Sequence, residues 1–66
     1  MIIQVNGEEK ECADGISLEQ FLAENGYRKE QIAVEVNEVI LPKAEYAGYI
    51  LAPNDKLEVV AFVGGG

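Results

Sequence analysis

One segment of this chain carries the complete chemistry of a helix start. Ser17 is a good N-cap, and Gln20 three residues later completes the pattern of a capping box. Ile16 before the cap and Phe21 at the fourth helical position form the apolar pair known as a hydrophobic staple. An Asn-Gly pair then supplies a left-handed stop. The pattern predicts one main helix, at about Leu18–Asn25.

The segments on either side of this helix are short, apolar and bounded by turn signals, as strands are. The first turn, Asn6-Gly7, is a strong hairpin signal because both central residues of a type I′ turn need a positive φ. The expected strands are Met1–Val5, Glu8–Ala13, Ile32–Val36, Val39–Leu41 and Lys56–Val63. The last of them is the longest, and its apolar run is typical of a central strand.

The order of these elements predicts an α+β fold. For one helix to cover one face of a mixed sheet, the first and last strands must lie in its middle, with a right-handed crossover from the second strand. This is the β-grasp, or ubiquitin-like, architecture: a mixed sheet of four to five strands with one main helix packed on one face. We expect one β-grasp domain over residues 1–63 and a flexible glycine tail over residues 64–66.

The charge balance excludes several classes of partner. Twelve acidic residues outnumber five basic ones, and the net charge is −7. Binding to nucleic acid or to an anionic membrane needs Lys and Arg, so we expect neither. No apolar run approaches the ~20 residues of a membrane span. The single cysteine, Cys12, cannot form an internal disulfide, and a cytoplasmic protein, monomeric when free, is the simplest interpretation.

The usual residues of catalysis and metal binding are missing. The sequence has no histidine, which excludes Ser-His and Cys-His nucleophiles and imidazole metal ligands. Cys12 has no CxxC partner and is interpreted as a small side chain in or beside the core. Glu8, Glu9 and Glu11 lack the spacing of a calcium loop and are expected to lie on a solvated strand. We therefore expect no enzyme activity, no metal site and no tightly bound cofactor.

The last three residues are the most informative ones for function. Gly64, Gly65 and Gly66 follow the last expected strand directly. Three extended residues reach ~10 Å, and without side chains they can enter a narrow tunnel in another protein. A terminal carboxylate, with a pKa of about 3.5, can attack the α-phosphate of ATP, and a thiolate or persulfide can then displace AMP. Gly66 would be the reacting acyl group; a frayed, uninformative end is the alternative.

Five stretches spread over the whole chain follow the pattern of one known family. They are Val5-Asn6-Gly7, Val36-Asn37, Leu41-Pro42-Lys43 with Tyr46, Asn54–Val60, and the ending Phe62-Val63-Gly64-Gly65-Gly66. Together they resemble the ThiS family of sulfur carrier proteins in thiamin biosynthesis. Asn54 is a departure, because the family often has Gly before the Asp, but Asn also tolerates the left-handed conformation.

The resemblance implies a cycle in which partner enzymes do the chemistry. An E1-like adenylyltransferase would activate Gly66 with ATP and Mg, and a cysteine desulfurase or other persulfide donor would lead to a C-terminal thiocarboxylate. Thiazole synthase would then take the sulfur into the thiazole ring. Gly64 and Gly65 would supply reach. The alternatives are a molybdopterin synthase small subunit or another sulfur carrier, a ubiquitin-like covalent modifier, and a plain interaction module.

Strand alternation also predicts a docking patch beside the tail. If Leu57 and Val59 point toward the helix, the even positions of the last strand point away from it. Val60 and Phe62 would then be two large apolar side chains, exposed directly upstream of the reactive tail, where partner enzymes dock. The alternative is that strand twist or a bulge tucks Phe62 under the sheet edge.

Overall fold

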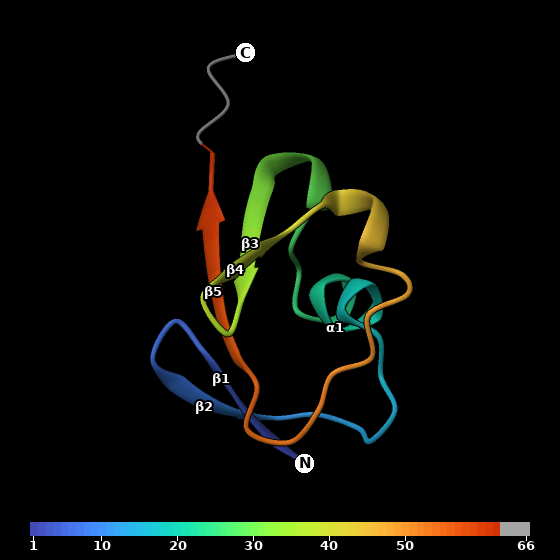
Figure 1. Ribbon diagram of the computed structural model, residues 1–66, viewed down its shortest axis with the longest axis vertical. Helices are drawn as coiled ribbons and strands as arrows, with labels where there is room; N and C mark the ends of the chain where they lie inside the picture. Colours follow the sequence, from blue (N-terminus) through green and yellow to red (C-terminus); the bar gives the residue numbers. More distant parts are fainter. Residues whose placement is uncertain (63–66) are drawn as a thin grey trace.

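The computed structural model describes residues 1–62 as one sheet with a single α-helix against it (Figure 1). The elements are β1 (Ile2–Val5), β2 (Glu8–Glu11), α1 (Leu18–Glu24), β3 (Ile32–Val36), β4 (Val39–Leu41) and β5 (Lys56–Ala61), with short 3-10 turns η1 (Lys29–Gln31) and η2 (Lys43–Glu45). Within these described residues, no helix has the length and apolar character needed to cross a membrane.

The sheet has the topology that the element order predicts. Its described strands lie in the order β2-β1-β5-β3-β4. β1 and β5 run parallel, whereas β1 with β2, β3 with β4 and β3 with β5 are antiparallel. The first and last strands therefore lie side by side inside a five-stranded mixed sheet, and the β-grasp prediction is confirmed.

The core lies between the sheet and α1, which covers one of its faces (Figure 1). Odd-numbered residues of β1, even-numbered residues of β3, and Leu57 and Val59 of β5 are buried in it, as the two-residue period of a strand requires. The buried side chains are Ile3, Val5, Ile16, Leu18, Phe21, Leu22, Ile32, Val34, Val36, Tyr46, Leu51, Leu57 and Val59. Cys12 packs against this core from the side, as predicted.

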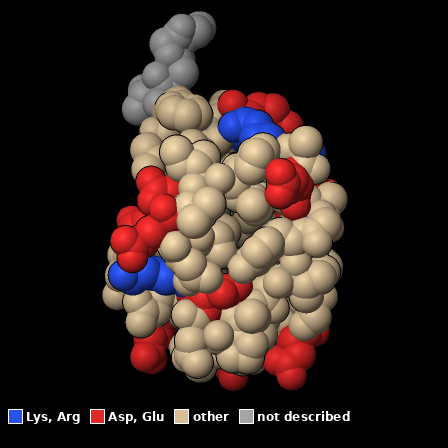
Figure 2. All heavy atoms as spheres, in the orientation of Figure 1, with Lys and Arg blue, Asp and Glu red and all other residues tan. Residues whose placement is uncertain are grey.

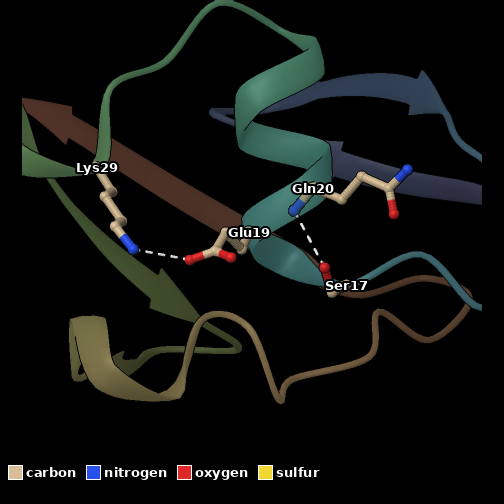
Figure 3. Close-up of polar contacts among 4 residues, drawn as sticks. All are labelled: Ser17, Glu19, Gln20 and Lys29. Atoms are coloured by element: carbon tan, nitrogen blue, oxygen red, sulfur yellow. Dashed lines mark hydrogen bonds and ion pairs between the residues drawn. The ribbon is translucent and has the colours of Figure 1, made fainter.

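The start of α1 forms largely as its sequence indicates (Figure 3). The Ser17 hydroxyl accepts a hydrogen bond from the Gln20 N–H at 3.1 Å. The predicted return bond of the capping box is wrong, because the Gln20 side chain turns along the helix and donates to the Glu24 carboxylate at 3.1 Å. A charged acceptor makes that bond the stronger choice. Ile16 and Phe21 are both buried, as the staple requires.

Three strands are shorter than predicted: β1 begins at Ile2, one residue after the expected Met1, and β2 and β5 each end opposite the first residue of a partner strand. β2 ends at Glu11, before the expected Ala13, because its partner β1 begins at the residue opposite Glu11. β5 ends at Ala61, which pairs with Ile32, the first residue of β3. The predicted end of the last strand, Val63, and the predicted glycine tail lie outside the described residues.

Candidate functional site

The C-terminal end of β5 is the candidate site, because it leads in sequence to the terminal glycines. Leu57 and Val59 are 0% and 8% exposed and face α1. Val60 and Phe62 are 56% and 52% exposed, on the face of the sheet away from the helix. The predicted face assignment is confirmed, and the alternative of a tucked Phe62 is wrong. The role of this pair in docking stays a prediction.

A further apolar side chain, which the sequence interpretation missed, lies on this outer face. Val60 pairs with Ala33, Glu58 pairs with Glu35, and Glu35 pairs in turn with Ile40. Directly opposed residues share a face, so Ile40, 70% exposed, joins Val60 on the side away from α1. A three-residue strand is too short to show alternation, and only the register with β3 reveals where Ile40 points.

Lys43 supports the end of β5 from the β4 side. β4 ends at Leu41, and Lys43, the residue that would pair next with Ile32, begins η2 instead, so the carbonyl of Ile32 lacks a strand partner. The ammonium of Lys43 donates to this carbonyl instead. The same ammonium lies 5.8 Å from the centroid of the Phe62 ring, within the range of a cation–π contact. Lys43 thereby holds both the start of β3 and the ring that follows β5.

Asn6 supports β5 from the β1 side. Backbone pairing of β1 with β5 reaches only Val5 opposite Leu57. The side-chain oxygen of Asn6 then accepts a hydrogen bond from the Val59 N–H at 2.7 Å, and its nitrogen donates to the Val59 carbonyl at 3.2 Å. The first hairpin turn is thereby bonded to the last strand.

A buried carboxylate fixes the loop before β5. Asp55, 6% exposed, accepts hydrogen bonds from the Tyr49 hydroxyl at 2.9 Å, from the Asn37 amide at 3.0 Å and from the Ala52 N–H at 2.9 Å. Burial acts to raise the pKa of Asp55, but these three donors outweigh it and hold the pKa below the usual 3.8. The sequence interpretation missed this network, because the Asn37 donor comes from the distant turn between β3 and β4.

Cys12 is poorly suited to carry sulfur. The thiol is half-buried, and burial raises its pKa above the usual 9.0, aided by the carboxylates of Asp14 and Glu11 and opposed by the N-terminal ammonium. The thiol is therefore protonated at neutral pH, whereas the thiolate is the reactive form. Among residues 1–62, no three His, Cys, Asp or Glu side chains lie close enough to hold a metal ion.

The visible side of the molecule carries more acidic than basic side chains. Figure 2 shows acidic side chains spread over the visible side of the molecule, with Lys and Arg in only a few places there. A hollow of 380 Å³ lies elsewhere, beside α1, where Glu19 and Lys29 form an ion pair at 2.8 Å (Figure 3). Its floor includes Leu22 and Tyr27. The hollow and the end of β5 share no residue.

A β-grasp domain whose last strand presents an apolar outer face and continues into terminal glycines is typical of ubiquitin-like carrier proteins. The sequence model of the ThiS family matches residues 3–66. The chain therefore belongs to the ThiS family, as the sequence resemblance predicts.

The chain is also similar to individual relatives and to a solved structure. The chain is 42% identical over 66 residues to a thiazole synthase from Paramagnetospirillum magneticum, and it spans a fifth of that protein's length (100% of this chain, 20% of the relative). It is 42% identical over 64 residues to the uncharacterized protein ycf40 of Pyropia yezoensis (97% and 90%). The crystal structure of thiamine biosynthesis protein ThiS from Geobacter metallireducens superposes with a TM-score of 0.82, 26% identity and full coverage of both chains.

Proposed function

We propose a route by which this ThiS-family chain carries sulfur in thiamin biosynthesis. Gly66 is adenylated, becomes a thiocarboxylate, and donates its sulfur to the thiazole ring. The observation that carries the proposal is the family match, which extends through the terminal glycines. The protein acts as a co-substrate of its partner enzymes and not as an enzyme.

The chemistry proceeds in three balanced steps. A carboxylate oxygen of Gly66 attacks the α-phosphorus of ATP, and pyrophosphate leaves. The terminal sulfur of a partner's persulfide attacks the acyl carbon, and AMP leaves with the electron pair of the broken C–O bond. This step leaves an acyl disulfide between Gly66 and the partner's cysteine. A second thiolate of the partner then attacks the sulfur of that cysteine. A disulfide forms within the partner, the S–S bond to the acyl sulfur breaks, and the thiocarboxylate of Gly66 is released.

Two features of the described residues support this route. Val60 and Phe62 form an exposed apolar pair immediately upstream of the tail, and we assign to them the docking of partner enzymes. The protonated, half-buried thiol of Cys12 favours the terminal carboxylate over the cysteine as the sulfur site.

The partners we propose are an E1-like adenylyltransferase that uses ATP and Mg, a cysteine desulfurase or other persulfide donor, and thiazole synthase. Support for the last comes from relatives named thiazole synthase, in which one fifth of the sequence is similar to this whole chain. When two domains that act one after the other are joined in one chain, each is present at a high effective concentration near the other.

Mass spectrometry tests the route. The protein is incubated with the adenylyltransferase, Mg-ATP and a persulfide source, and its intact mass should rise by the difference between sulfur and oxygen. Tandem spectra should place the change on Gly66. Omission of ATP is one control, and Cys12→Ala, which should be converted normally, is the matched control.

Two outcomes contradict the route. A mass change on Cys12 identifies the thiol as the sulfur site and ends the carboxylate proposal. A ladder of heavier conjugates in an immunoblot of cell extract supports the covalent-modifier alternative, whereas a carrier gives one small band.

A further inference from the structure

The edge of β5 that faces β1 is hydrogen-bonded as far as Val59 and has no described partner beyond it. Backbone pairing with β1 covers Lys56 and Leu57, and the side chain of Asn6 then bonds Val59. β1 has by this point turned away into the hairpin. Within residues 1–62, no hydrogen-bond partner meets Ala61 on this side.

The register of the sheet shows where the backbone groups of Ala61 point. The Phe62 N–H donates to the carbonyl of Gln31 at 2.7 Å, so Phe62 directs its backbone toward the β3 side. Directions alternate along an antiparallel strand, so Ala61 must direct its backbone to the opposite side. Leu57 confirms the alternation, because its carbonyl accepts from the Asn6 N–H at 2.9 Å on the β1 side. The N–H and C=O of Ala61 therefore face an open edge.

This edge differs from the outer edges of the sheet. β2 consists entirely of charged residues, Glu-Glu-Lys-Glu, and charges discourage the addition of a further strand. β4 has only three residues and is followed by Pro42, which cannot donate to a ladder. The edge at Ala61 has neither a run of charged residues nor a proline. It is flanked by the exposed apolar side chains of Val60 and Phe62.

We propose that an enzyme acting on Gly66 adds an extended segment of its own backbone to this edge, with hydrogen bonds to the N–H and C=O of Ala61. This inference rests on the proposed function. When a strand is added to a sheet edge, main-chain hydrogen bonds provide the affinity and every second side chain provides the specificity. The added strand places apolar side chains beside Val60 and Phe62, and the net charge of −7 favours basic residues flanking it.

Strand addition also orients the substrate. A strand paired at Ala61 fixes the direction in which the chain continues toward Gly66, five residues later. The tail is thereby aligned with the partner before it reaches the active site, and alignment of this kind lowers the entropy cost of the reaction.

Hydrogen exchange at one amide tests the inference directly. In the free protein, the Ala61 N–H should exchange with solvent at nearly the rate of an unprotected amide, while the Phe62 N–H is protected by Gln31. In the complex with the adenylyltransferase, the Ala61 N–H should become protected. Absence of protection in a complex that forms normally overturns the inference.

Removal of the Ala61 N–H tests the same inference in an adenylation assay. Ala61→Pro deletes the donor on the open edge, where a proline ring meets no strand, and the melting temperature should barely change. The KM for adenylation should rise about tenfold, because the backbone hydrogen bond from the Ala61 N–H is lost. N-methylalanine at position 61, introduced by chemical synthesis, is the second variant should the proline disturb the fold. Ala61→Ser keeps the N–H and should behave like the wild type.

The outcomes separate this inference from the function on which it rests. If the wild type is not adenylated at all, both fail. If the wild type is adenylated and the proline and N-methyl variants match it, only the strand addition is wrong. Protection of the Ala61 amide that depends on the concentration of the free protein assigns the edge to a second copy of this chain, and the proposed occupant is then wrong.

Discussion

The side chain of Asn6 hydrogen-bonds both backbone groups of Val59, with the N–H bond at 2.7 Å and the carbonyl bond at 3.2 Å. Asn6 also adopts a left-handed backbone, with a φ of 51°, at the first position of the hairpin turn. One residue thus closes the first hairpin and continues the ladder of β1 along β5. The strand that precedes the glycines is therefore bonded to the first hairpin.

Asn6→Gly should isolate the contribution of this side chain to stability. Glycine keeps the positive φ without strain, so the substitution removes the amide and little else from the folded state. We expect unfolding in urea to become easier by about 1–3 kcal/mol, since both groups of Val59 lose a partner. Asn6→Ala should cost more, because alanine adds the strain of a left-handed backbone. Equal stability of wild type and Asn6→Gly contradicts the role of the amide.

Glu38→Gly should stabilise the protein. Asn37 and Glu38 have φ values of 51° and 73°, the same positions that Asn6 and Gly7 occupy in the first hairpin. A non-glycine residue in this conformation costs about 1–2 kcal/mol, of which the larger chain entropy of glycine cancels part. We expect a net gain of about 0.5–1 kcal/mol in thermal or urea unfolding.

The reverse exchange in the first hairpin is the control. A Cβ at Gly7 meets no atom within 4 Å, so Gly7→Ala tests the backbone alone. It should destabilise the protein by about 1 kcal/mol. A Glu38→Gly protein that unfolds more easily than the wild type rules out backbone strain at this turn.

The sequence is sufficient to predict the fold because its local signals agree with one another. The N-cap at Ser17, the Asn6-Gly7 turn and the alternation at Leu57–Val60 each act over a few residues, and all favour the same element order. The outward direction of Val60 follows from the same period of two. Local chemistry of this kind can be recognised without a structure.

The supports of the site cannot be predicted in that way. Asp55 becomes a buried acceptor only because Tyr49 and Asn37 converge on it from other segments. The Lys43 side chain bonds the carbonyl of Ile32 because β4 ends at Leu41, one pair before Ile32 would be reached, and that register depends on the whole sheet. Long-range contacts set these roles, and the residue types alone are equally compatible with exposed turns.

Asp55 should make the protein sensitive to acid. Its pKa is lower in the folded than in the unfolded state, so the ionised carboxylate contributes stability above the unfolded pKa of about 3.9. This contribution is lost as the pH falls through the lower, folded pKa. Asp55→Asn should therefore flatten the pH dependence of unfolding between about pH 5 and pH 2. It should also cost about 1–3 kcal/mol at pH 7, because an amide cannot accept from all three donors.

An exposed carboxylate provides the comparison for Asp55. Glu9→Gln removes the same charge from an exposed position on β2, where the carboxylate makes no described hydrogen bond. Its pH profile should follow that of the wild type. Identical profiles for Asp55→Asn and the wild type place the acid sensitivity elsewhere.

Val60→Asp should separate docking from folding. Val60 is 56% exposed, so the substitution should leave the melting temperature nearly unchanged while it weakens binding to the adenylyltransferase at least tenfold. Ile50→Asp adds the same charge at an equally exposed site outside the strands and should leave binding intact. Leu57→Ala should do the opposite of Val60→Asp and cost about 2–5 kcal/mol of stability, since Leu57 is fully buried. Calorimetric titration measures binding and thermal unfolding measures stability for the three variants. Normal binding by Val60→Asp would show that partners do not dock on the outer face of the sheet.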